Sequence, residues 1–304
     1  MAGRREREGL ATPRSEVNPE PVQANAPRGF VFGRRRFLAS VAGACLLAAV
    51  AGVEEVEATE APSATDGGVA SPGRHTSTAE ERSLLDPRSF RSVWTTQPLV
   101  ALTFDDGPDP DYTPHVLDLL ADAGARATFF MVGRNATAHP DLVARARREG
   151  HVVANHTMDH LFLDALPEAA VATEVDRGQD VLRRLESPSN AWFRPPRGWT
   201  SAAVATVTAA RGVRSVFWTD CVEAHAHHRM PAAAARAVAS AARPGSILLA
   251  HDGGTITGPN PQRIDRSFTV ETLPVLLREL RRRSLRSVGL TELVTSGLPG
   301  FQQE

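Results

Sequence analysis

From Ser92 onward, short apolar runs alternate with longer amphipathic stretches, and this alternation most limits the folds open to the chain. The apolar runs predict strands at Leu99–Phe104, Ala127–Val132, His151–Ala154, Ala191–Arg194, Arg214–Trp218, Ser246–His251 and Ser284–Gly289. The amphipathic stretches predict helices at Pro114–Ala123, Pro140–Glu149, Pro167–Leu185, Ser201–Arg211, Pro231–Ala242 and Thr269–Arg283. Such alternation implies right-handed crossovers and a parallel sheet. We therefore predict an α/β fold, and the seven repeats favour a small or incomplete β/α barrel over an open doubly wound sheet.

The composition is that of a globular protein. Of the 304 residues, 42% are hydrophobic and 23% are charged, which is enough to bury a large core. The formal net charge of -1 gives no indication of nucleic-acid binding. We therefore expect no nucleic-acid partner, and we expect a monomer.

The first fifty residues have the pattern of an export signal. The run Gly33–Leu38 resembles the twin-arginine motif, and the apolar stretch Val41–Val53 behind it is too short to span a bilayer comfortably. Ala49–Ala51 offers a cleavage site of small residues. We predict a signal peptide over 1–51, export by the twin-arginine machinery, and a secreted or cell-wall associated protein. The alternatives are an uncleaved anchor and a lipoprotein attached at Cys45.

A linker and one domain follow the signal. Residues 52–95 are rich in Ala, Ser, Thr, Pro, Gly and Glu and poor in aromatic residues. Such a segment cannot bury enough apolar surface to offset the entropy lost on ordering, so we predict a disordered linker. The domain is predicted over 96–297, with a tail over 298–304. After cleavage Cys221 would be the only cysteine, which excludes an internal disulfide.

Two adjacent carboxylates stand where the first predicted strand must end. Asp105 and Asp106 are followed by Gly107 and Pro108, which cannot extend a strand. Neighbouring side chains on an extended backbone point in opposite directions, so one carboxylate could hold a metal ion while the other handles a proton. The alternative is a polar turn, in which Asp, Gly and Pro are common.

Two histidines follow the third predicted strand. His156 and His160 are four residues apart, which would place them on one face of a helical turn with their Cβ atoms about 5–6 Å apart. With one carboxylate from another strand end, they would form a metal site that keeps open positions for water and substrate. The alternative is a pair of exposed loop histidines.

Further strand ends carry an arginine, a histidine and an aspartate. Arg194 begins a turn made rigid by two prolines and Gly198, and an Arg in a carboxylate-rich centre can pair with a catalytic Asp. His251 ends a buried strand, and imidazole is a natural proton donor to a departing amine. Asp220 could raise the pKa of a neighbouring imidazole. The alternatives are an Arg in solvent and a structural His.

The order of these strand ends carries more information than any one of them. The motifs read TFDDGP (103–108), NHTMDH (155–160), RPPRG (194–198), FWTD (217–220) and LLAH (248–251). Over roughly Leu99 to Leu293, the chain resembles the polysaccharide deacetylases, carbohydrate esterase family 4, which contain the NodB homology domain. The resemblance implies a distorted (β/α)7 barrel and metal-dependent hydrolysis of acetyl groups.

By that resemblance, Asp105 is the catalytic base and Arg194 orients it. The metal ligands would be Asp106, His156 and His160. The implied cofactor is a divalent ion, with Zn²⁺ as the first choice and Co²⁺ or another divalent ion as alternatives.

The resemblance also implies the remaining roles. His251 would be the general acid, with Asp220 tuning it. Leu249 would line the pocket for the acetyl methyl group, Trp218 would contact substrate, and the backbone N–H of Arg197 would bind the oxyanion.

The chain departs from the family pattern on the substrate side. Where the family often has an aromatic residue, this chain has Arg197, which keeps the N–H but changes the wall. The fourth family motif commonly ends in Asp-Trp, and here the pair is Glu223-Ala224, so one aromatic wall of the sugar groove is missing. A histidine cluster follows, which we interpret as a solvated substrate-side loop, with a second metal contact as the alternative: His225, His227 and His228.

The implied substrate is an acetylated polysaccharide. The first choice is N-acetylglucosamine in peptidoglycan or chitin-type oligomers, with release of acetate. One alternative is an esterase acting on O-acetylated xylan, because the same chemistry cleaves an ester more easily than an amide. The other is a carbohydrate-binding relative without activity.

Overall fold

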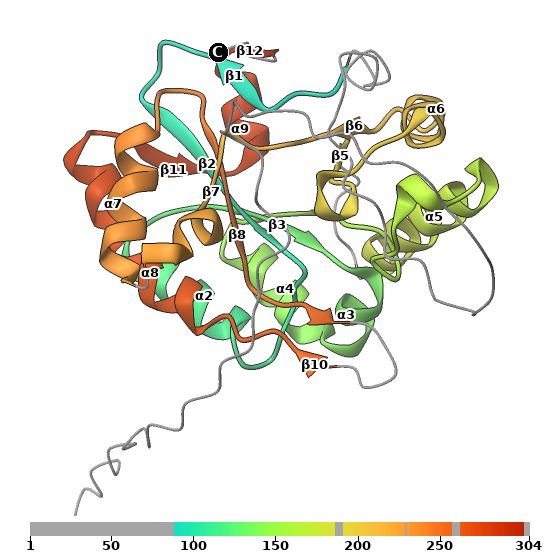
Figure 1. Ribbon diagram of the computed structural model, residues 1–304, viewed down its shortest axis with the longest axis horizontal. Coiled ribbons are helices and arrows are strands. Elements are labelled where there is room, and N and C mark those ends of the chain that lie inside the picture. The colour runs from blue at the N-terminus through green and yellow to red at the C-terminus, as the bar shows by residue number, and fades with distance from the viewer. Residues whose placement is uncertain (1–87, 186–190, 229, 257–261, 301–304) are drawn as a thin grey trace, which may run out of the picture. The chain divides into compact units, whose positions relative to one another are not determined.

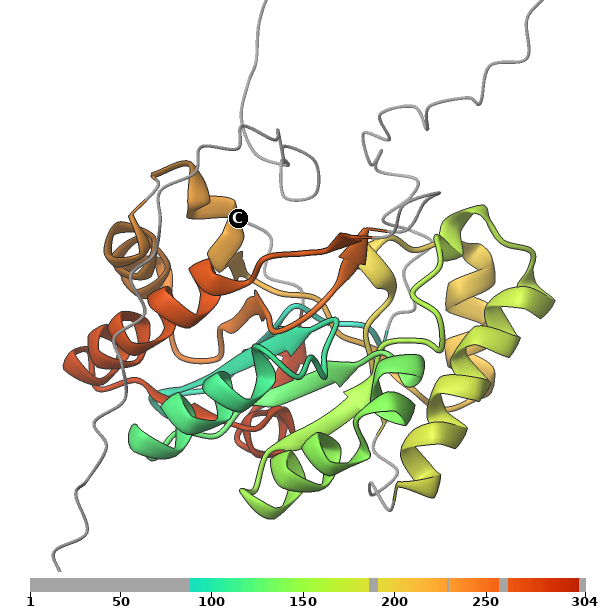
Figure 2. The ribbon, with the colours of Figure 1, turned by 90° about the horizontal axis from the view of Figure 1, so that it is seen from below.

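One parallel sheet organises the domain in the computed structural model, which describes residues 88–185, 191–228, 230–256 and 262–300 (Figure 1). Within these ranges the strand order is β6-β5-β4-β3-β2-β8-β7, with β11 also paired to β2. The strands are β2 (Leu99–Asp105), β3 (Thr128–Met131), β4 (Val152–Asn155), β5 (Trp192–Phe193), β6 (Arg214–Ser215), β7 (Asp220–Cys221), β8 (Ile247–His251) and β11 (Arg286–Val288). The sheet curls into a half-barrel (Figure 2), which confirms the α/β fold and the distorted (β/α)7 barrel.

Helices follow the strands and lie around the sheet (Figure 1). They are α2 (Thr113–Asp122), α3 (Gly133–Ala138), α4 (Pro140–Arg148), α5 (Glu168–Arg184), α6 (Ala202–Ala210), α7 (Pro231–Ala241), α8 (Ser267–Arg282) and α9 (Leu290–Thr295). Pro stands in the first turn of α2, α4 and α7, where its missing N–H is tolerated. Two helices, α3 and α9, escape prediction because six residues are too few to show a helical period.

The connections contain shorter elements. Three 3₁₀ turns are η1 (Leu163–Ala165), η2 (Pro196–Gly198) and η3 (Val222–His228). A separate antiparallel pair is formed by β9 (Thr255–Ile256) and β10 (Gln262–Arg263). Strand β7 escapes prediction because it begins at the polar Asp220 and contains no apolar run.

Strand β2 lies at the centre of the sheet and is buried along its whole length. One edge pairs with β8, and the other pairs first with β11 and then with β3. This register sets Asp105 beside His251 of β8 and beside Phe130 of β3. The carboxyl ends of three parallel strands therefore meet at Asp105.

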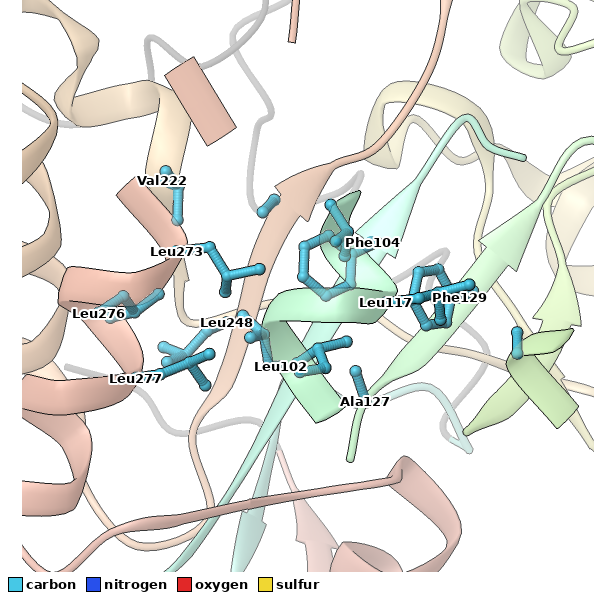
Figure 3. Packing of buried hydrophobic residues seen from close by; sticks show 14 of the residues in the cluster. Leu102, Phe104, Leu117, Ala127, Phe129, Val222, Leu248, Leu273, Leu276 and Leu277 are labelled. Carbon is cyan, nitrogen blue, oxygen red and sulfur yellow. The ribbon is translucent and has the colours of Figure 1, made fainter. Parts of the chain in front are cut away.

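Alternate residues of β2 belong to two different apolar layers. Leu102 and Phe104 face the helices and pack near leucines of α2 and α8 (Figure 3). Leu99 and Ala101 belong to a second cluster, on the opposite face of the sheet. Because side chains alternate along a strand, Asp105 lies on this second, inner face.

The folded domain extends beyond both predicted boundaries. Strand β1 (Ser92–Trp94) pairs antiparallel with β12 (Leu298–Gly300). Phe90 and Val93 are at most 1% exposed. Both ends of the domain are therefore part of its packing.

The linker predicted over 52–95 and the tail predicted over 298–304 are wrong at these positions. Pairing between segments so far apart in the chain leaves no local pattern in either of them. The predicted signal peptide, 1–51, and residues 52–87 lie outside the described residues. In the ranges that the structure describes, no helix is long and apolar enough to cross a membrane.

The buried His151, just before β4, makes the stability of the fold depend on pH. Its Nδ1 accepts a hydrogen bond from the backbone N–H of Ala127 at 3.1 Å, which requires that this nitrogen carry no proton. Burial lowers the pKa of His151 from 6.5 to about 4. The stabilisation is therefore complete above pH 6.5 and is lost as the pH falls from 6.5 toward 4.

We expect this residue to lower the free energy of unfolding by about 1–2 kcal/mol between pH 7.5 and pH 5. In His151→Asn, whose amide oxygen can still accept the hydrogen bond, that part of the pH dependence should disappear although overall stability falls. Urea unfolding of both proteins at the two pH values measures the difference. An identical pH dependence in the variant would contradict the assignment.

Candidate active site

A buried ion pair lies at the base of the site. Arg194 Nη1 donates a hydrogen bond to Asp105 Oδ1 at 2.7 Å, and the two side chains are 0% and 5% exposed. The guanidinium also donates to Thr103 Oγ1 and to the backbone oxygen of Val216, both at 2.9 Å. It stacks 4.1 Å above the centroid of the Phe130 ring. The predicted pairing is confirmed, and it fixes one oxygen of Asp105.

The three predicted metal ligands converge beside this pair. Oδ1 of Asp106 lies 3.1 Å from Nε2 of His160 and 3.5 Å from Nε2 of His156. The three donor atoms all lie within 4.8 Å of one another. The structure therefore brings together the residues that the sequence predicted.

The hydrogen bonding of His156 indicates that a cation fits between these groups. Its Nδ1 lies 2.7 Å from the backbone oxygen of Arg194, which can only accept, so Nδ1 carries the ring proton. In the neutral ring, Nε2 then turns a lone pair toward Asp106 Oδ1, and two acceptors face each other. Two imidazole nitrogens and one carboxylate oxygen form a donor set found in catalytic zinc sites.

The electrostatics of the cluster favour the ligand forms of two residues. Burial alone would raise the pKa of Asp106, but the adjacent imidazoles of His156 and His160 outweigh burial and hold the pKa well below its usual range. Burial lowers the pKa of His160, against the opposing effect of Asp106. Asp106 is therefore ionised and His160 is held toward its neutral form.

The backbone around the site corrects one expectation. His156 and His160 lie in a loop after β4 and not on a helical turn. Thr157 and His160 both have positive φ angles, 68° and 57°, which cost about 1–2 kcal/mol each. The His160 N–H donates to Thr157 Oγ1 at 3.0 Å, which closes the loop and brings the two imidazole centroids to 5.0 Å.

Glu223 is the carboxylate that faces His251. Its Oε2 lies 3.1 Å from Nδ1 of His251, and its Oε1 accepts from the His251 backbone N–H at 3.0 Å and from Thr269 Oγ1 at 2.9 Å. Burial alone would lower the pKa of His251, but the charge of Glu223 raises it to about 9. Burial alone would raise the pKa of Glu223, and the charge of His251 lowers it to about 2.

The prediction that Asp220 tunes His251 is therefore wrong. Asp220 Oδ1 accepts from the backbone N–H of Cys221 at 2.8 Å and lies 3.0 Å from His225 Nε2. It holds the start of η3 in place. The expectation that His225 is a solvated loop residue is also wrong, because it is half-buried against Asp220. The side chains of His227 and His228 lie outside the described residues.

The substrate-side residues gather around η2. Arg197 has a φ of 59°, and its guanidinium carbon lies 3.8 Å from the centroid of the Phe162 ring. Phe162 packs on Trp199 with ring centroids 5.5 Å apart, and the two are 41% and 39% exposed. Burial lowers the pKa of Arg197, while the nearby Asp106 acts in the opposite direction. An exposed aromatic pair with an arginine thus lies near Asp106, one of the predicted metal ligands.

Trp218 and Leu249, the other two predicted substrate residues, are less exposed than the aromatic pair Phe162 and Trp199. Trp218 packs so tightly on Gly198 that a Cβ there would come within 2.6 Å of its ring. Leu249 is buried in β8 and pairs with Thr103 of β2. Their roles toward substrate stay predictions.

The sequence missed Arg266, which lies just before α8. Its Nη2 donates to Oδ2 of Asp106 at 3.0 Å, and its Nε donates to the backbone oxygen of Gly253 at 2.7 Å. Asp106 therefore turns one oxygen toward the histidines and the other toward Arg266. No sequence motif accompanies this arginine.

Comparison with known proteins agrees with this geometry. A family model described as polysaccharide deacetylase matches residues 93–216. The peptidoglycan-N-acetylglucosamine deacetylase of Bacillus cereus is 34% identical over 226 residues, which make up 70% of this chain and 97% of that protein. This chain belongs to the polysaccharide deacetylase family.

Other members of the family extend the comparison. The chitooligosaccharide deacetylase of Sinorhizobium fredii is 39% identical over 60% of this chain and 85% of its own. The family 4 carbohydrate esterase from Streptomyces lividans, solved in complex with acetate, has a TM-score of 0.57 and 27% identity. The match covers 69% of this chain and 100% of that structure. The resemblance inferred from the motifs is confirmed.

Family membership also explains how Glu223 could have been found. It stands where the fourth motif of the family commonly has the Asp of its Asp-Trp pair, three residues after Asp220. The signal was therefore present, but the longer side chain and the missing Trp concealed it.

Glu223→Gln should lower the pKa of His251 well below its value of about 9, because burial is then opposed only by the more weakly acting charge of Asp106. Asp220→Asn is the matched control, since it removes a carboxylate three positions away and should leave that pKa unchanged. Titration of the His251 ring by NMR measures both. If Asp220→Asn produced the larger shift, the pairing with Glu223 would be wrong.

Proposed function

We propose that this family member is a metal-dependent deacetylase that removes N-acetyl groups from N-acetylglucosamine units of peptidoglycan or chitin-type oligomers. The observation that carries the proposal is the pair of groups at adjacent strand ends: Asp105 fixed by Arg194, and His251 charged by Glu223. The activities for which the relatives in Bacillus cereus and Sinorhizobium fredii are named support this substrate class.

We propose that Asp106, His156 and His160 hold a divalent ion. Zn²⁺ is the first choice because the donor set is two imidazoles and a carboxylate, and Co²⁺ or another divalent ion is the alternative. When bound, such an ion supplies Lewis-acid activation of water and of the acetyl carbonyl.

Asp105 acts as the general base. Its Oδ1 is committed to Arg194, and its Oδ2 lies 3.8 Å from His156 Nε2, on the side of the metal ligands. Oδ2 is therefore the oxygen that removes a proton as water adds to the carbonyl carbon. The backbone N–H of Arg197 then stabilises the negative charge that develops on the carbonyl oxygen.

His251 acts as the general acid. With a pKa of about 9 it holds its proton at neutral pH. It gives this proton to the nitrogen as the carbon–nitrogen bond breaks, so that the amine leaves as a neutral group and acetate remains. The glucosamine unit stays in the polymer.

The first test is acetate release from N-acetylglucosamine oligomers by the purified protein. We expect a chelator to abolish release and Zn²⁺ to restore it, because the base and acid then lack an activated water. Asp105→Asn should lower kcat/KM by roughly 10²–10⁴-fold, the usual loss for a general base. The exposed Asp141→Asn serves as the control for a neutralised carboxylate and should behave as wild type.

Each other outcome redirects the assignment. Release from acetylated xylan but not from the sugar amides would make the protein an esterase. No release from either, with sugar binding intact, would favour the non-catalytic relative. Release that survives the chelator would overturn the metal dependence.

We propose that residues 1–51 direct export by the twin-arginine machinery and that the enzyme acts outside the cytoplasmic membrane. The motif at Gly33–Leu38 supports this. Replacing Arg34 and Arg35 by Lys should leave the full-length chain inside the cell. The same replacement at Arg4 and Arg5 is the control and should not change export. Cell fractionation locates the protein, and N-terminal sequencing shows whether residues 1–51 have been removed. Unchanged export of the first variant would contradict the route.

A further inference from the structure

We propose that Cys221, Glu223 and His251 form a second site for a divalent transition-metal cation, separate from the three predicted ligands of the catalytic ion. Cys221 ends β7, Glu223 lies in η3, and His251 ends β8. Their sulfur, oxygen and nitrogen donor atoms all lie within 4.8 Å of one another. The proposal goes beyond the deacetylase activity, and the binding it describes does not depend on that activity.

The three donors converge on one carboxylate oxygen. Oε2 of Glu223 lies 3.3 Å from Cys221 Sγ and 3.1 Å from His251 Nδ1. The other oxygen, Oε1, is already held by the backbone N–H of His251 and by Thr269 Oγ1. Oε2 is therefore fixed in place as the ligand atom.

A second observation points to a ligand at this place. Nδ1 of His251 is buried and makes no aligned hydrogen bond with any group that the structure describes, although Oε2 is close. Such an atom is costly to leave without a directional partner. A cation bound by Nδ1, Oε2 and Sγ would satisfy it.

The chemistry of the donors selects the class of cation. Thiolate, imidazole and carboxylate together are ligands of Zn²⁺, and three protein ligands leave a fourth position open. Thiolate also favours transition metals over Mg²⁺ or Ca²⁺. We therefore expect Zn²⁺ and Co²⁺ to bind and Mg²⁺ not to bind.

The site is rigid and can be reached from solvent. Cys221 pairs with Leu249 across β7 and β8, so its position is fixed by the sheet. The side chains of Glu223 and His251 are each 18% exposed, while Cys221 is 3% exposed. An ion can thus enter past the carboxylate and the imidazole and bind the sulfur behind them.

An ion in this site would inhibit the enzyme. It would occupy the nitrogen that faces Glu223 and would replace the proton that we assign to His251. This consequence, unlike the binding itself, rests on the proposed role of His251 as general acid. Zinc in excess of the catalytic ion should therefore lower turnover.

The test is titration of the metal-free full chain with Co²⁺, followed by absorption in the near ultraviolet, where a cobalt-bound thiolate gives a charge-transfer band. The three predicted ligands of the catalytic ion contain no sulfur, so the band can come only from a cysteine, Cys221 or Cys45. We expect two bound equivalents in the wild type and a band that grows with one of them. Asp106→Ala should lose one equivalent and keep the band.

Cys221→Ser should abolish the band and weaken the second equivalent by at least roughly 10–100-fold. Cys45→Ser is the matched control, because Cys45 is the other cysteine of the chain, and it should keep the band. Glu223→Gln should weaken the second equivalent without removing the thiol. Circular dichroism and thermal unfolding show whether each variant is folded.

A single bound equivalent in the wild type, a band that Cys45→Ser removes, or a band that survives Cys221→Ser would each overturn the proposal. Inhibition is measured in a separate assay. Its measure is the turnover at excess Zn²⁺ divided by the turnover at one equivalent of Zn²⁺ in the same protein. That ratio should be closer to one in Cys221→Ser than in wild type. Absent turnover at one equivalent of metal, in a protein that gives the cobalt band when more is added, would reject the deacetylase assignment and leave the second site standing.

Discussion

The buried ion pair between Arg194 and Asp105 is the constraint on which the rest of the site depends. The guanidinium is fully buried, and it donates to Asp105 and Thr103 of β2 and to the backbone oxygens of Val216 and Phe217, which follow β6. Removing one partner of such a pair costs about 3–5 kcal/mol, because the other charge stays buried. The pair therefore fixes the relative positions of separate strand ends and at the same time orients the proposed base.

Next to this pair, successive side chains at the end of β2 point in different directions, and this gives Asp105 and Asp106 different partners. Asp105 is the last residue of β2 and faces the inner side of the sheet, where it meets Arg194. Asp106 is the first residue beyond the strand, and its positive φ of 74° turns its carboxylate toward the histidines and Arg266. Two identical side chains thus have different partners and different charges around them. The proposed base and the proposed metal ligand are thereby placed one residue apart.

The surroundings of His160 and of His251 shift the pKa values of these two histidines in opposite directions. In the metal cluster, burial and nearby cationic groups hold His160 toward neutrality, which suits a ligand. Beside it, Glu223 faces His251 and raises its pKa, which suits a proton donor. The same pairing of Glu223 with His251 brings in Cys221 and creates the second donor cluster. One side chain therefore serves the chemistry and the proposed inhibition.

The sequence by itself determined seven of the eight strands of the parallel sheet and the convergence of Asp105, Asp106, His156, His160 and Arg194. Apolar runs and the residues that end them are local patterns, and a parallel sheet brings such strand ends to one edge. Tertiary structure alone decided that Glu223 and not Asp220 faces His251, that Arg266 holds Asp106, and that β1 pairs with β12. The physical reason is that these contacts depend on the path of a short 3₁₀ turn or on segments far apart in the chain. Neither leaves a period or a spacing that can be read before folding.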